Sequence, residues 1–388
     1  MITYEGKNVP IKSWCENPEE GALDQARNLA SLPFVFKQVC LMPDTHSGYG
    51  MPIGGVIATR NVVIPNAVGV DIGCGMCAVK TTLNDITSDQ IKELFGAIRY
   101  KVPVGFKHRE REYNSSIFDS GNFPYLSVIL EELSSARKQL GTLGGGNHFI
   151  EIQKGDDGHI WIMIHSGSRN FGLKIANHYN KLAQELCTMW YSDIPPIKGQ
   201  DGLAFLPLNT NEGRNYMDAM NYALRFAREN RRIMMRDIQD IFETQHDIKF
   251  TEEINIHHNY ASIENHFGHN VVVHRKGATS AKEGQLGIIP GSQGTCSYIV
   301  KGKGNINSFM SCSHGAGRKM SRKKAKNELN LEEEIKKMND KGIVHSIRHK
   351  DNLDEASSAY KDIDVVMEEQ KDLVDIVVKL TPLGVIKG

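Results

Sequence analysis

The sequence predicts an α+β fold: a single compact domain over residues 1–388, whose mixed β-sheet core forms a cleft for metal and nucleotide and carries a helical insertion. Three observations lead to this expectation. Residues 36–81 alternate short β-branched runs with Gly and Pro, which is typical of packed strands and tight turns. Between Phe171 and His246 apolar residues recur near the helical period, so the insertion is expected over roughly 171–250. The candidate site residues come from both ends of the chain, which favours one domain.

The other elements follow in chain order. An expected helix carries its apolar residues on one face: Leu126, Ile129, Leu130 and Leu133. Further strands are expected at 140–153 and 159–169, and a Pro/Gly loop at 191–213 interrupts the helical insertion. More strands are expected in "NVVVHRKGAT", "GIIPGS" and "SYIV". A charged helix is expected over roughly 320–338, and an apolar segment at 375–387 closes the chain.

Bulk composition indicates no particular partner. Lys+Arg and Asp+Glu both number 46, so any RNA site must be a local basic patch. The N-terminus resembles no targeting segment and no apolar run approaches the length of a membrane helix, which predicts a soluble, cytoplasmic protein without a membrane partner. The seven cysteines have no regular spacing, which predicts reduced thiols and not a disulfide framework.

Residue types that bind metals follow several of the apolar runs. The segment "VGVDIGCGMC" places Asp71 and Cys74 in a Gly-rich turn that can aim both side chains at one point. The segments "GGGNHF", "MIHSG" and "HHNY" add His148, His165, and either His257 or His258. Imidazole, carboxylate and thiolate are common ligands of divalent transition metals, and one thiolate can bridge two ions. Each histidine alone is more often an ordinary polar residue at a strand end, but the collection predicts a metal site.

Cys74 and Cys77 also form a C-x-x-C pair. This spacing occurs in zinc knuckles and in redox dithiols. A zinc site is disfavoured because the chain has no second C-x-x-C. A redox dithiol is disfavoured because no thioredoxin-like βαβ pattern surrounds the pair. We therefore expect Cys74 to be functional and Cys77 to pack in the interior.

A nucleotide site is suggested by "GTLGGGNHFIE", where consecutive glycines expose backbone N–H groups to phosphate. Asn147 offers a donor there, and Glu151 an acceptor for ribose or base. The segment matches neither a P-loop nor a dinucleotide fingerprint, and a simple glycine turn explains it equally well. Near the end of the chain, Tyr360 could stack on a base and Lys387 could donate to a purine carbonyl, although an interface tyrosine and a solvated lysine are the default interpretations.

The segment "SCSHGAGRKMSR" offers a nucleophile. A neutral imidazole at His314 could attack phosphorus while Arg318 neutralises phosphate charge. The phosphoramidate so formed is easily cleaved again. The alternatives are that His314 is another metal ligand or a polar residue at a helix N-terminus.

Ten segments in order resemble the RNA-splicing ligase RtcB family, across essentially the whole chain: "PDTHSGYG", "VGVDIGCGM", "LGTLGGGNHFIEI", "HSGSR", "HHNY", "RKGA", "IIPGS", "CSHGAGRKMSR", "AYKDID" and "VIKG". The resemblance implies that one manganese ion is held by Asp71, Cys74 and His148 and a second by Cys74, His165 and His258. His258 is chosen over His257 because the family pattern is His followed by Asn, here Asn259. It also implies a GTP pocket made of Asn147, His148, Phe149, Ile150, Glu151, His258, Asn259, Pro290, Gly291, Ser292, Gln293, Ser297, His314, Gly315, Ala316, Gly317, Tyr360 and Lys387.

The resemblance further implies a reaction. His314 would attack the α-phosphorus of GTP and become guanylylated, with loss of pyrophosphate. An RNA 2′,3′-cyclic phosphate would be opened to a 3′-phosphate that accepts GMP from the histidine. A 5′-hydroxyl end would then attack the activated phosphate and release GMP, as in tRNA splicing or RNA repair. Donors of this kind would also accept zinc or cobalt, so manganese rests on the resemblance.

RNA is expected to follow a basic surface. Single candidates are Arg169 near the metal ligands, Lys276 in "RKGA", and Arg318. A further group lies on the expected long helix, where a solvated helix face is an equally good interpretation: Arg225, Arg228, Arg231, Arg232 and Arg236. The chain departs from the family pattern after "RKGAT", where Ser280 and Ala281 precede Lys282, and in a short segment at 108–126. These departures bear on which RNA ends the protein prefers more than on the reaction that it catalyses.

Two other functions are compatible with parts of this pattern. A two-metal phosphatase or cyclic phosphodiesterase acting on RNA ends would need the same metal ligands. It would not need a guanylylated histidine, so His314 distinguishes the two enzymes. A non-catalytic RNA-binding protein with the same fold is disfavoured by the presence of every expected ligand and of His314.

Overall fold

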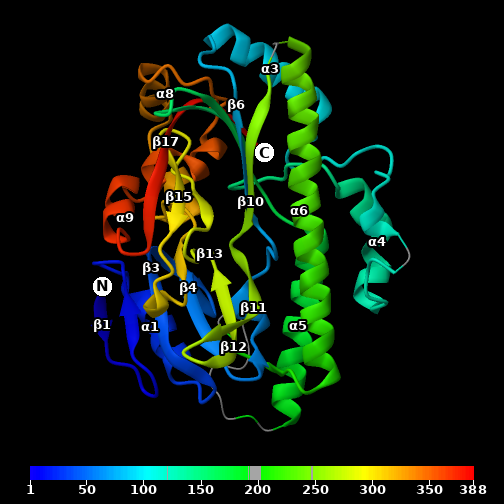
Figure 1. The fold of residues 1–388 in the computed structure, drawn as a ribbon, viewed down its shortest axis with the longest axis vertical. Helices are drawn as coiled ribbons and strands as arrows, with labels where there is room; N and C mark the ends of the chain where they lie inside the picture. The colour runs from blue at the N-terminus through cyan, green and yellow to red at the C-terminus, as the bar shows by residue number, and fades with distance from the viewer. Residues whose placement is uncertain (120, 191, 193–201, 246–247) are drawn as a thin grey trace.

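The expected α+β class is confirmed by a computed structural model that describes residues 1–119, 121–190, 192, 202–245 and 248–388. Two large sheets lie side by side, and the long helix α6 runs along one flank of the molecule (Figure 1). Each sheet combines strands from distant parts of the chain, so both halves of the sequence contribute to each sheet.

The first sheet has six strands in the order β1-β2-β3-β4-β12-β11. Only the β2–β3 pair among these is parallel. The strand bounds are Ile2–Tyr4 (β1), Ile11–Ser13 (β2), Val35–Tyr49 (β3), Met51–Thr59 (β4), His269–Lys276 (β12) and Asn259–His266 (β11). The register of β3 against β4 shifts between Leu41 and His46, as at a β-bulge, and such a shift re-aims the side chains beside it.

The second sheet has seven strands in the order β10-β6-β8-β7-β17-β15-β14, all paired antiparallel. The strand bounds are Phe250–His257 (β10), Gly75–Thr81 (β6), Ile160–Ser166 (β8), Phe149–Gly155 (β7), Val374–Lys387 (β17), Ser297–Gly302 (β15) and Leu286–Ile289 (β14). The strand β10 ends at His257 in this sheet and β11 begins at Asn259 in the other. His258 is therefore the single residue that joins the two sheets at this point.

Two short strand pairs complete the described β-structure: Val62–Val63 (β5) with Leu206–Pro207 (β9), and Ala278–Ser280 (β13) with Ser311–Ser313 (β16). The helices are Glu20–Ala30 (α1), Pro65–Val68 (α2), Ser88–Lys101 (α3), Ser127–Gln139 (α4), Arg169–Met189 (α5), Asn211–Gln245 (α6), Arg322–Glu328 (α7), Leu331–Asp340 (α8) and Ile363–Glu369 (α9). Single 3₁₀ turns lie at Ser116–Phe118, Ile306–Ser308, Lys350–Glu355 and Ser357–Ala359.

Helices α5 and α6 occupy much of the range expected to be helical, and they bury their apolar faces in one core with α4. The division of the chain into a domain and an insertion stays a prediction. The expected Pro/Gly loop at 191–213 lies largely outside the described residues. Among the described helices, none is long and apolar enough to cross a membrane.

One expected helix is two helices in the structure. The range 320–338 contains α7 and α8, separated at Leu329 and Asn330. The Asn330 side chain accepts hydrogen bonds from the backbone of Glu332 and Glu333, which starts a new helix. Helices α1 and α3 were not expected from the sequence.

Candidate active site

The metal-ligating residue types lie in one row at an end of the seven-stranded sheet. Strand β6 begins one residue after Cys74, and β7 begins one residue after His148. Within the sheet, Gly75 pairs with Ser166 on one side and with His257 on the other. Because the register aligns these strand ends, residues far apart in the sequence meet there.

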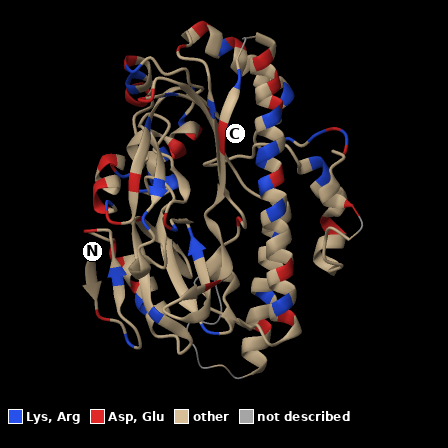
Figure 2. Cartoon of the chain, in the orientation of Figure 1, with Lys and Arg blue, Asp and Glu red and all other residues tan. Residues whose placement is uncertain are grey.

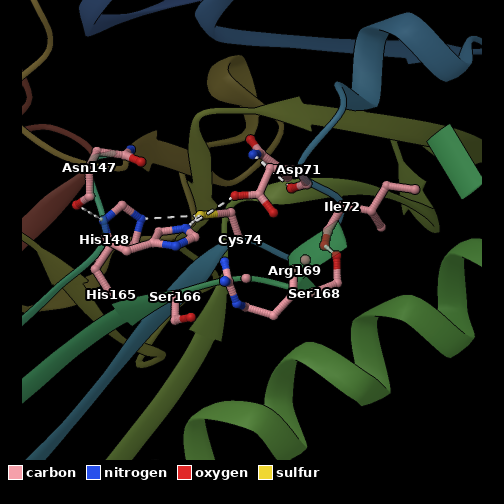
Figure 3. Close-up of polar contacts among 12 residues, drawn as sticks. Asp71, Ile72, Cys74, Asn147, His148, His165, Ser166, Ser168 and Arg169 are labelled. Atoms are coloured by element: carbon pink, nitrogen blue, oxygen red, sulfur yellow. Dashed lines mark hydrogen bonds and ion pairs between the residues drawn. The ribbon is translucent and has the colours of Figure 1, made fainter. Parts of the chain in front are cut away.

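Asp71, Cys74 and His148 form the first donor group. The Nε2 atom of His148 lies 3.3 Å from Asp71 Oδ2 and 3.5 Å from Cys74 Sγ. Figure 3 shows the carboxylate, the thiol and the imidazoles converging from separate elements. All three ligand atoms lie within 4.8 Å of one another, so the group could hold one metal ion.

Cys74, His165 and His258 form the second donor group, again within 4.8 Å. His165 Nε2 lies 3.2 Å from Cys74 Sγ and 3.4 Å from His258 Nε2. Cys74 belongs to both groups, the arrangement that the family resemblance implies. Of the tandem histidines, His258 is the one aimed at this point, while His257 bonds towards Arg231 and Gly73.

A backbone carbonyl and a glycine position help to orient the donors. His165 Nδ1 lies 3.1 Å from the carbonyl of Asn147, a contact in which Nδ1 carries the proton and Nε2 keeps its lone pair (Figure 3). Gly144 has φ +97°, and a Cβ there would lie 2.1 Å from Arg169 Nη1 and 2.4 Å from His148 Nδ1. Only glycine leaves room for both side chains.

Arg231 is completely buried behind the donor groups. Its guanidinium donates to the carbonyls of Gly73 and Ser166, at 3.0 and 2.8 Å, and lies 3.2 Å from His257 Nδ1. Each of these residues is adjacent in sequence to a member of a donor group. Arg231 therefore ties together three of the strand ends that form the row.

Burial keeps the imidazoles of His165 and His258 neutral and the Cys74 thiol protonated. It holds the pKa values of His165 and His258 well below the usual histidine value, and nearby His314 adds to the effect. Burial, reinforced by Asp71, raises the pKa of Cys74 well above that of a free thiol. The imidazoles can therefore ligate without losing a proton, whereas the thiol needs a cation beside it to become a thiolate.

The C-x-x-C alternative receives no support. Cys77 is fully buried among apolar residues of β6 and its neighbours, as expected for a packing residue. Neither donor group found among the described residues includes it. All seven cysteines are free, in agreement with the expected reduced thiols.

His314 follows strand β16 and lies next to the second donor group. Its ring centroid is 4.8 Å from that of His258, at an interplanar angle of 66°. His314 Nδ1 lies 2.6 Å from Oδ2 of the fully buried Asp44, and the same oxygen accepts the backbone N–H groups of His314 and Gly315. Nδ1 is thus the donor, and Nε2 is left as the lone-pair nitrogen.

Asp44 was not among the residues predicted to function. It lies at the β3 bulge, and Gly317, with φ +73°, packs so closely on it that a Cβ would lie 2.2 Å from the Asp44 carbonyl oxygen. Burial would raise the pKa of Asp44, but His314 and Lys361 hold that pKa below the ordinary aspartate value. The carboxylate is therefore ionised and can stabilise positive charge on His314.

Replacing Asp44 with asparagine should slow any reaction in which His314 is the nucleophile, by roughly 100-fold or more. The amide is uncharged, so it cannot neutralise an imidazolium. If its NH₂ group replaced Oδ2, it would face the two backbone N–H groups as a third donor and leave them without an acceptor. The rate of covalent labelling in a single turnover measures the effect, with Asp24→Asn on the exposed face of α1 as control. An unchanged rate in Asp44→Asn would contradict this role.

A cavity of about 730 Å³ opens beside these groups. It is lined by most of the residues expected in the nucleotide pocket, namely Asn147, Phe149, Glu151, His258, Asn259, Pro290, Gly291, Ser292, Gln293, His314, Gly315, Ala316, Gly317, Tyr360 and Lys387. The donor residues Asp71, Cys74 and His165 line the same cavity. A single hollow therefore presents both donor groups, His314 and the candidate nucleotide contacts.

Comparison with known proteins agrees with this arrangement. A family model described as tRNA-splicing ligase RtcB matches residues 25–123 and 124–388. The chain belongs to the RtcB family. The RNA-splicing ligase RtcB of Escherichia coli (strain K12) is 39% identical over 415 residues, which cover 100% of this chain and 99% of the relative. The tRNA-splicing ligase RtcB of Nanoarchaeum equitans (strain Kin4-M) is 33% identical over 470 residues, with 100% and 97% covered.

Within this RtcB chain, three expected pocket residues do not line the cavity. Ile150 is fully buried in the core, because alternate side chains of β7 face opposite ways and Phe149 and Glu151 take the cavity side. Ser297 lies behind the cavity wall, where its Oγ accepts the N–H of Gly291 at 3.1 Å. His148 belongs to the first donor group.

Glu355 organises the part of the cavity lined by Tyr360 and Lys387, although nothing in the sequence singled it out beyond its position shortly before Tyr360. It is 4% exposed and accepts a hydrogen bond from the Tyr360 hydroxyl. Its carboxylate lies 2.9 Å from Arg322, 3.3 Å from Arg318 and 3.9 Å from Lys387. Burial would raise the pKa of Glu355, but these cations hold it below the ordinary value.

The basic residues expected to contact RNA or phosphate are mostly engaged inside the protein. Arg318 donates to the carbonyl of Asp354 at 2.6 Å and lies over the Tyr360 ring. Lys276 is 7% exposed and donates to the carbonyls of Tyr49 and Asn66. These two side chains line the cavity and do not form an outer track.

The arginines of α6 divide into two sets. Figure 2 shows Lys and Arg positions recurring along this helix. Of the five arginines in the expected group, Arg225, Arg228, Arg232 and Arg236 are exposed. Arg232 pairs with Glu229 at 2.6 Å, and Arg236 bonds to the Tyr113 hydroxyl. Arg231 does not belong to this face, so the expectation that included it was wrong. The remaining stripe is partly neutralised, and its role in RNA binding stays a prediction.

Proposed function

We propose that this chain, an RNA ligase by its family, joins RNA 2′,3′-cyclic phosphate or 3′-phosphate ends to 5′-hydroxyl ends, using GTP and two manganese ions, with His314 as the covalent carrier. The observation that carries the proposal is the Asp44–His314 pair beside the two donor groups. A site for metal hydrolysis alone would not need an imidazole that lines the cavity and has one nitrogen held by a buried carboxylate.

The donor residues fit the proposed manganese ions. Their ligand atoms converge, two imidazoles are neutral, and Cys74 is placed to serve both positions. Bound there, the ions would supply Lewis acidity to phosphate oxygens. Arg231 adds a buried positive charge behind the donors, which favours an anionic, phosphate-rich ligand in front of them.

The part of the cavity lined by Glu151, Tyr360 and Lys387 suits a guanine base. Glu151 can accept the N–H groups of the base edge, and Lys387 can donate to its carbonyl, as expected from the sequence. Lys387 also lies 5.6 Å from the Phe149 ring. Glu355 and Arg318 hold the Tyr360 ring from behind, so we assign Arg318 to positioning Tyr360 in preference to neutralising phosphate.

In the first proposed step, the His314 Nε2 lone pair forms a bond to the α-phosphorus of GTP, and the bond to pyrophosphate breaks. No proton leaves the imidazole, which becomes cationic and is stabilised by the Asp44 carboxylate. A 3′-phosphate oxygen of the RNA then attacks the same phosphorus and restores neutral His314. Finally the 5′-hydroxyl oxygen attacks the 3′-phosphorus, loses its proton, and GMP leaves.

Ligation of two short RNAs with defined ends tests the proposal. One RNA carries a 2′,3′-cyclic phosphate, or alternatively a 3′-phosphate, and the other carries a 5′-hydroxyl. We expect joined product only when GTP and manganese are both present. Conversion of the cyclic phosphate to a 3′-phosphate without joining, with or without GTP, would favour the rival two-metal phosphodiesterase.

Glu151 should make GTP binding depend on pH. Burial is the main cause that raises the pKa of Glu151, to about 8, so the carboxyl is mostly protonated at neutral pH in the free protein. If guanine binds the carboxylate, binding must release that proton. Affinity should therefore rise with pH, approaching tenfold per unit well below pH 8, and level off above pH 8.

The Glu151→Gln variant is the control, because its side chain does not titrate. Equilibrium binding of GTP is measured for both proteins across the same pH range, which cancels the titration of the nucleotide itself. The wild-type slope should exceed that of Glu151→Gln below pH 8. Identical slopes would contradict contact between guanine and an ionised Glu151.

A further inference from the structure

The tip of the β3–β4 hairpin, residues Ser47–Gly50, lies at the cavity and presents an aromatic side chain to solvent. Tyr49 is 55% exposed and lines the cavity. Val70, 48% exposed, lines it as well and directly precedes the donor residue Asp71. Among the large apolar side chains that the described part of the chain leaves exposed, these two alone belong to the cavity wall.

The backbone of this hairpin tip is fixed by side chains from other elements. Gln25 of α1 makes two hydrogen bonds to Gly48: its Nε2 donates to the carbonyl at 2.7 Å, and its Oε1 accepts the N–H at 3.0 Å. Glu19, which precedes α1, accepts the N–H of Ser47. The tip therefore cannot move freely, although it is a surface turn.

Tyr49 itself is held through its carbonyl. Buried Lys276 donates to that oxygen and to the carbonyl of Asn66, the latter at 3.0 Å. Asn66 in turn donates to the carbonyl of Gly202 at 2.8 Å. Lys276, which was expected to contact RNA, therefore fixes the backbone of Tyr49, the residue with the exposed ring.

A fixed backbone with an exposed aromatic ring is a stacking platform. Exposed aromatic rings stack on nucleobases, and such stacking tolerates any sequence because every base has a π-face. The guanine end of the cavity differs, since Glu151 and Lys387 can read the edge of a base there. The apolar Val70 lines the same cavity, and the Tyr49 carbonyl already accepts a hydrogen bond from Lys276. This suits a ligand whose base identity varies.

We propose that Tyr49 stacks on the unpaired terminal base of an RNA end and so delivers that end to the donor groups and His314. The inference rests on the proposed function and adds the place where RNA is gripped. Because Tyr49 and Asp71 line the same cavity, a base stacked at Tyr49 would place its phosphate in the hollow that holds the donor residues. The contact is independent of sequence, as joining ends of varied sequence requires.

Direct RNA binding tests the proposal without any covalent step. Fluorescence anisotropy is measured with manganese and without GTP, using single-stranded RNAs that end in a 3′-phosphate or a 5′-hydroxyl. Each RNA is prepared with its terminal base and in an abasic form. Tyr49→Ala should bind one of the intact RNAs roughly 5- to 100-fold more weakly, and Tyr49→Phe should bind it like wild type.

Two controls separate stacking from a general defect. The abasic form of the affected RNA should bind wild type and Tyr49→Ala equally. Tyr100→Ala removes a tyrosine that is 96% exposed on α3, away from the cavity, and should bind as wild type does. Equal binding of intact RNA by Tyr49→Ala and wild type, or equal weakening with abasic RNA, would overturn the proposal.

Labelling of His314 by GTP, measured on the same preparations, distinguishes this failure from failure of the proposed function. Absence of label in wild type would overturn the guanylylation mechanism and leave the RNA comparison valid. Loss of label in Tyr49→Ala alone would place Tyr49 in the nucleotide site, which would overturn the stacking proposal.

Discussion

Replacing His314 with alanine is expected to abolish covalent labelling of the protein by GTP radiolabelled at the α-phosphate. The variant removes the imidazole that lines the cavity, and Asp44, which is fully buried, cannot replace it as a nucleophile. Metal content should be unchanged, because His314 belongs to neither donor group. Loss of label with metal retained is the pattern that identifies a nucleophile and not a ligand.

The measurement combines denaturing electrophoresis with elemental analysis of the dialysed protein. Wild type should carry an acid-labile label, as expected for a phosphoramidate. His178→Ala is the matched control, since it removes an exposed histidine of α5 that lies outside the cavity lining. Label that persists in His314→Ala would point to His46, another imidazole on the cavity wall, and would contradict the proposed carrier.

The metal donors could be predicted from sequence because most of them lie beside an apolar strand: Cys74 and His148 directly precede β6 and β7, His165 lies at the end of β8, and His258 follows β10. Such positions place polar side chains at a sheet end, and the register of the seven-stranded sheet then brings Cys74, His148 and His165 together. Sequence spacing could not supply that register. The choice of His258 over His257 likewise came from the family pattern, and its physical basis is that His258 is the residue between β10 and β11.

The supporting residues could not be predicted, because their partners are remote in sequence. Asp44 and His314 are separated by 270 positions, and only the folded chain shows that one holds the other. Glu355 lies between cations contributed by different segments. A buried carboxylate looks the same in sequence as a solvated one.

Arg231 is a case where the sequence did contain the signal. It follows Ala227 by four residues and precedes Met234 by three, so it lies on the apolar stripe of α6. Its grouping with the exposed arginines followed from composition alone. Lys276 offered no such signal, since strand alternation is consistent with either face and its partners are backbone carbonyls from other elements.

Replacing Cys74 with alanine is expected to lower bound manganese below one ion per chain, and to remove GTP labelling with it. Cys74 is the one residue common to both donor groups, so its loss leaves each group with two protein ligands. His165→Ala damages only the second group and should retain more metal. The difference in metal content between Cys74→Ala and His165→Ala shows whether the Cys74 thiolate serves both donor groups.

Cys77→Ala provides the matched control, because Cys77 is a fully buried thiol three positions away that packs in the core. It should retain the metal content of wild type. Substitution with cobalt adds a direct readout: the thiolate-to-cobalt charge-transfer absorption should vanish in Cys74→Ala and persist in Cys77→Ala. Since burial keeps the Cys74 thiol protonated without a cation, cobalt binding by wild type should also release a proton that Cys74→Ala does not release. Unchanged metal stoichiometry in Cys74→Ala would refute the shared ligand and leave two separate sites.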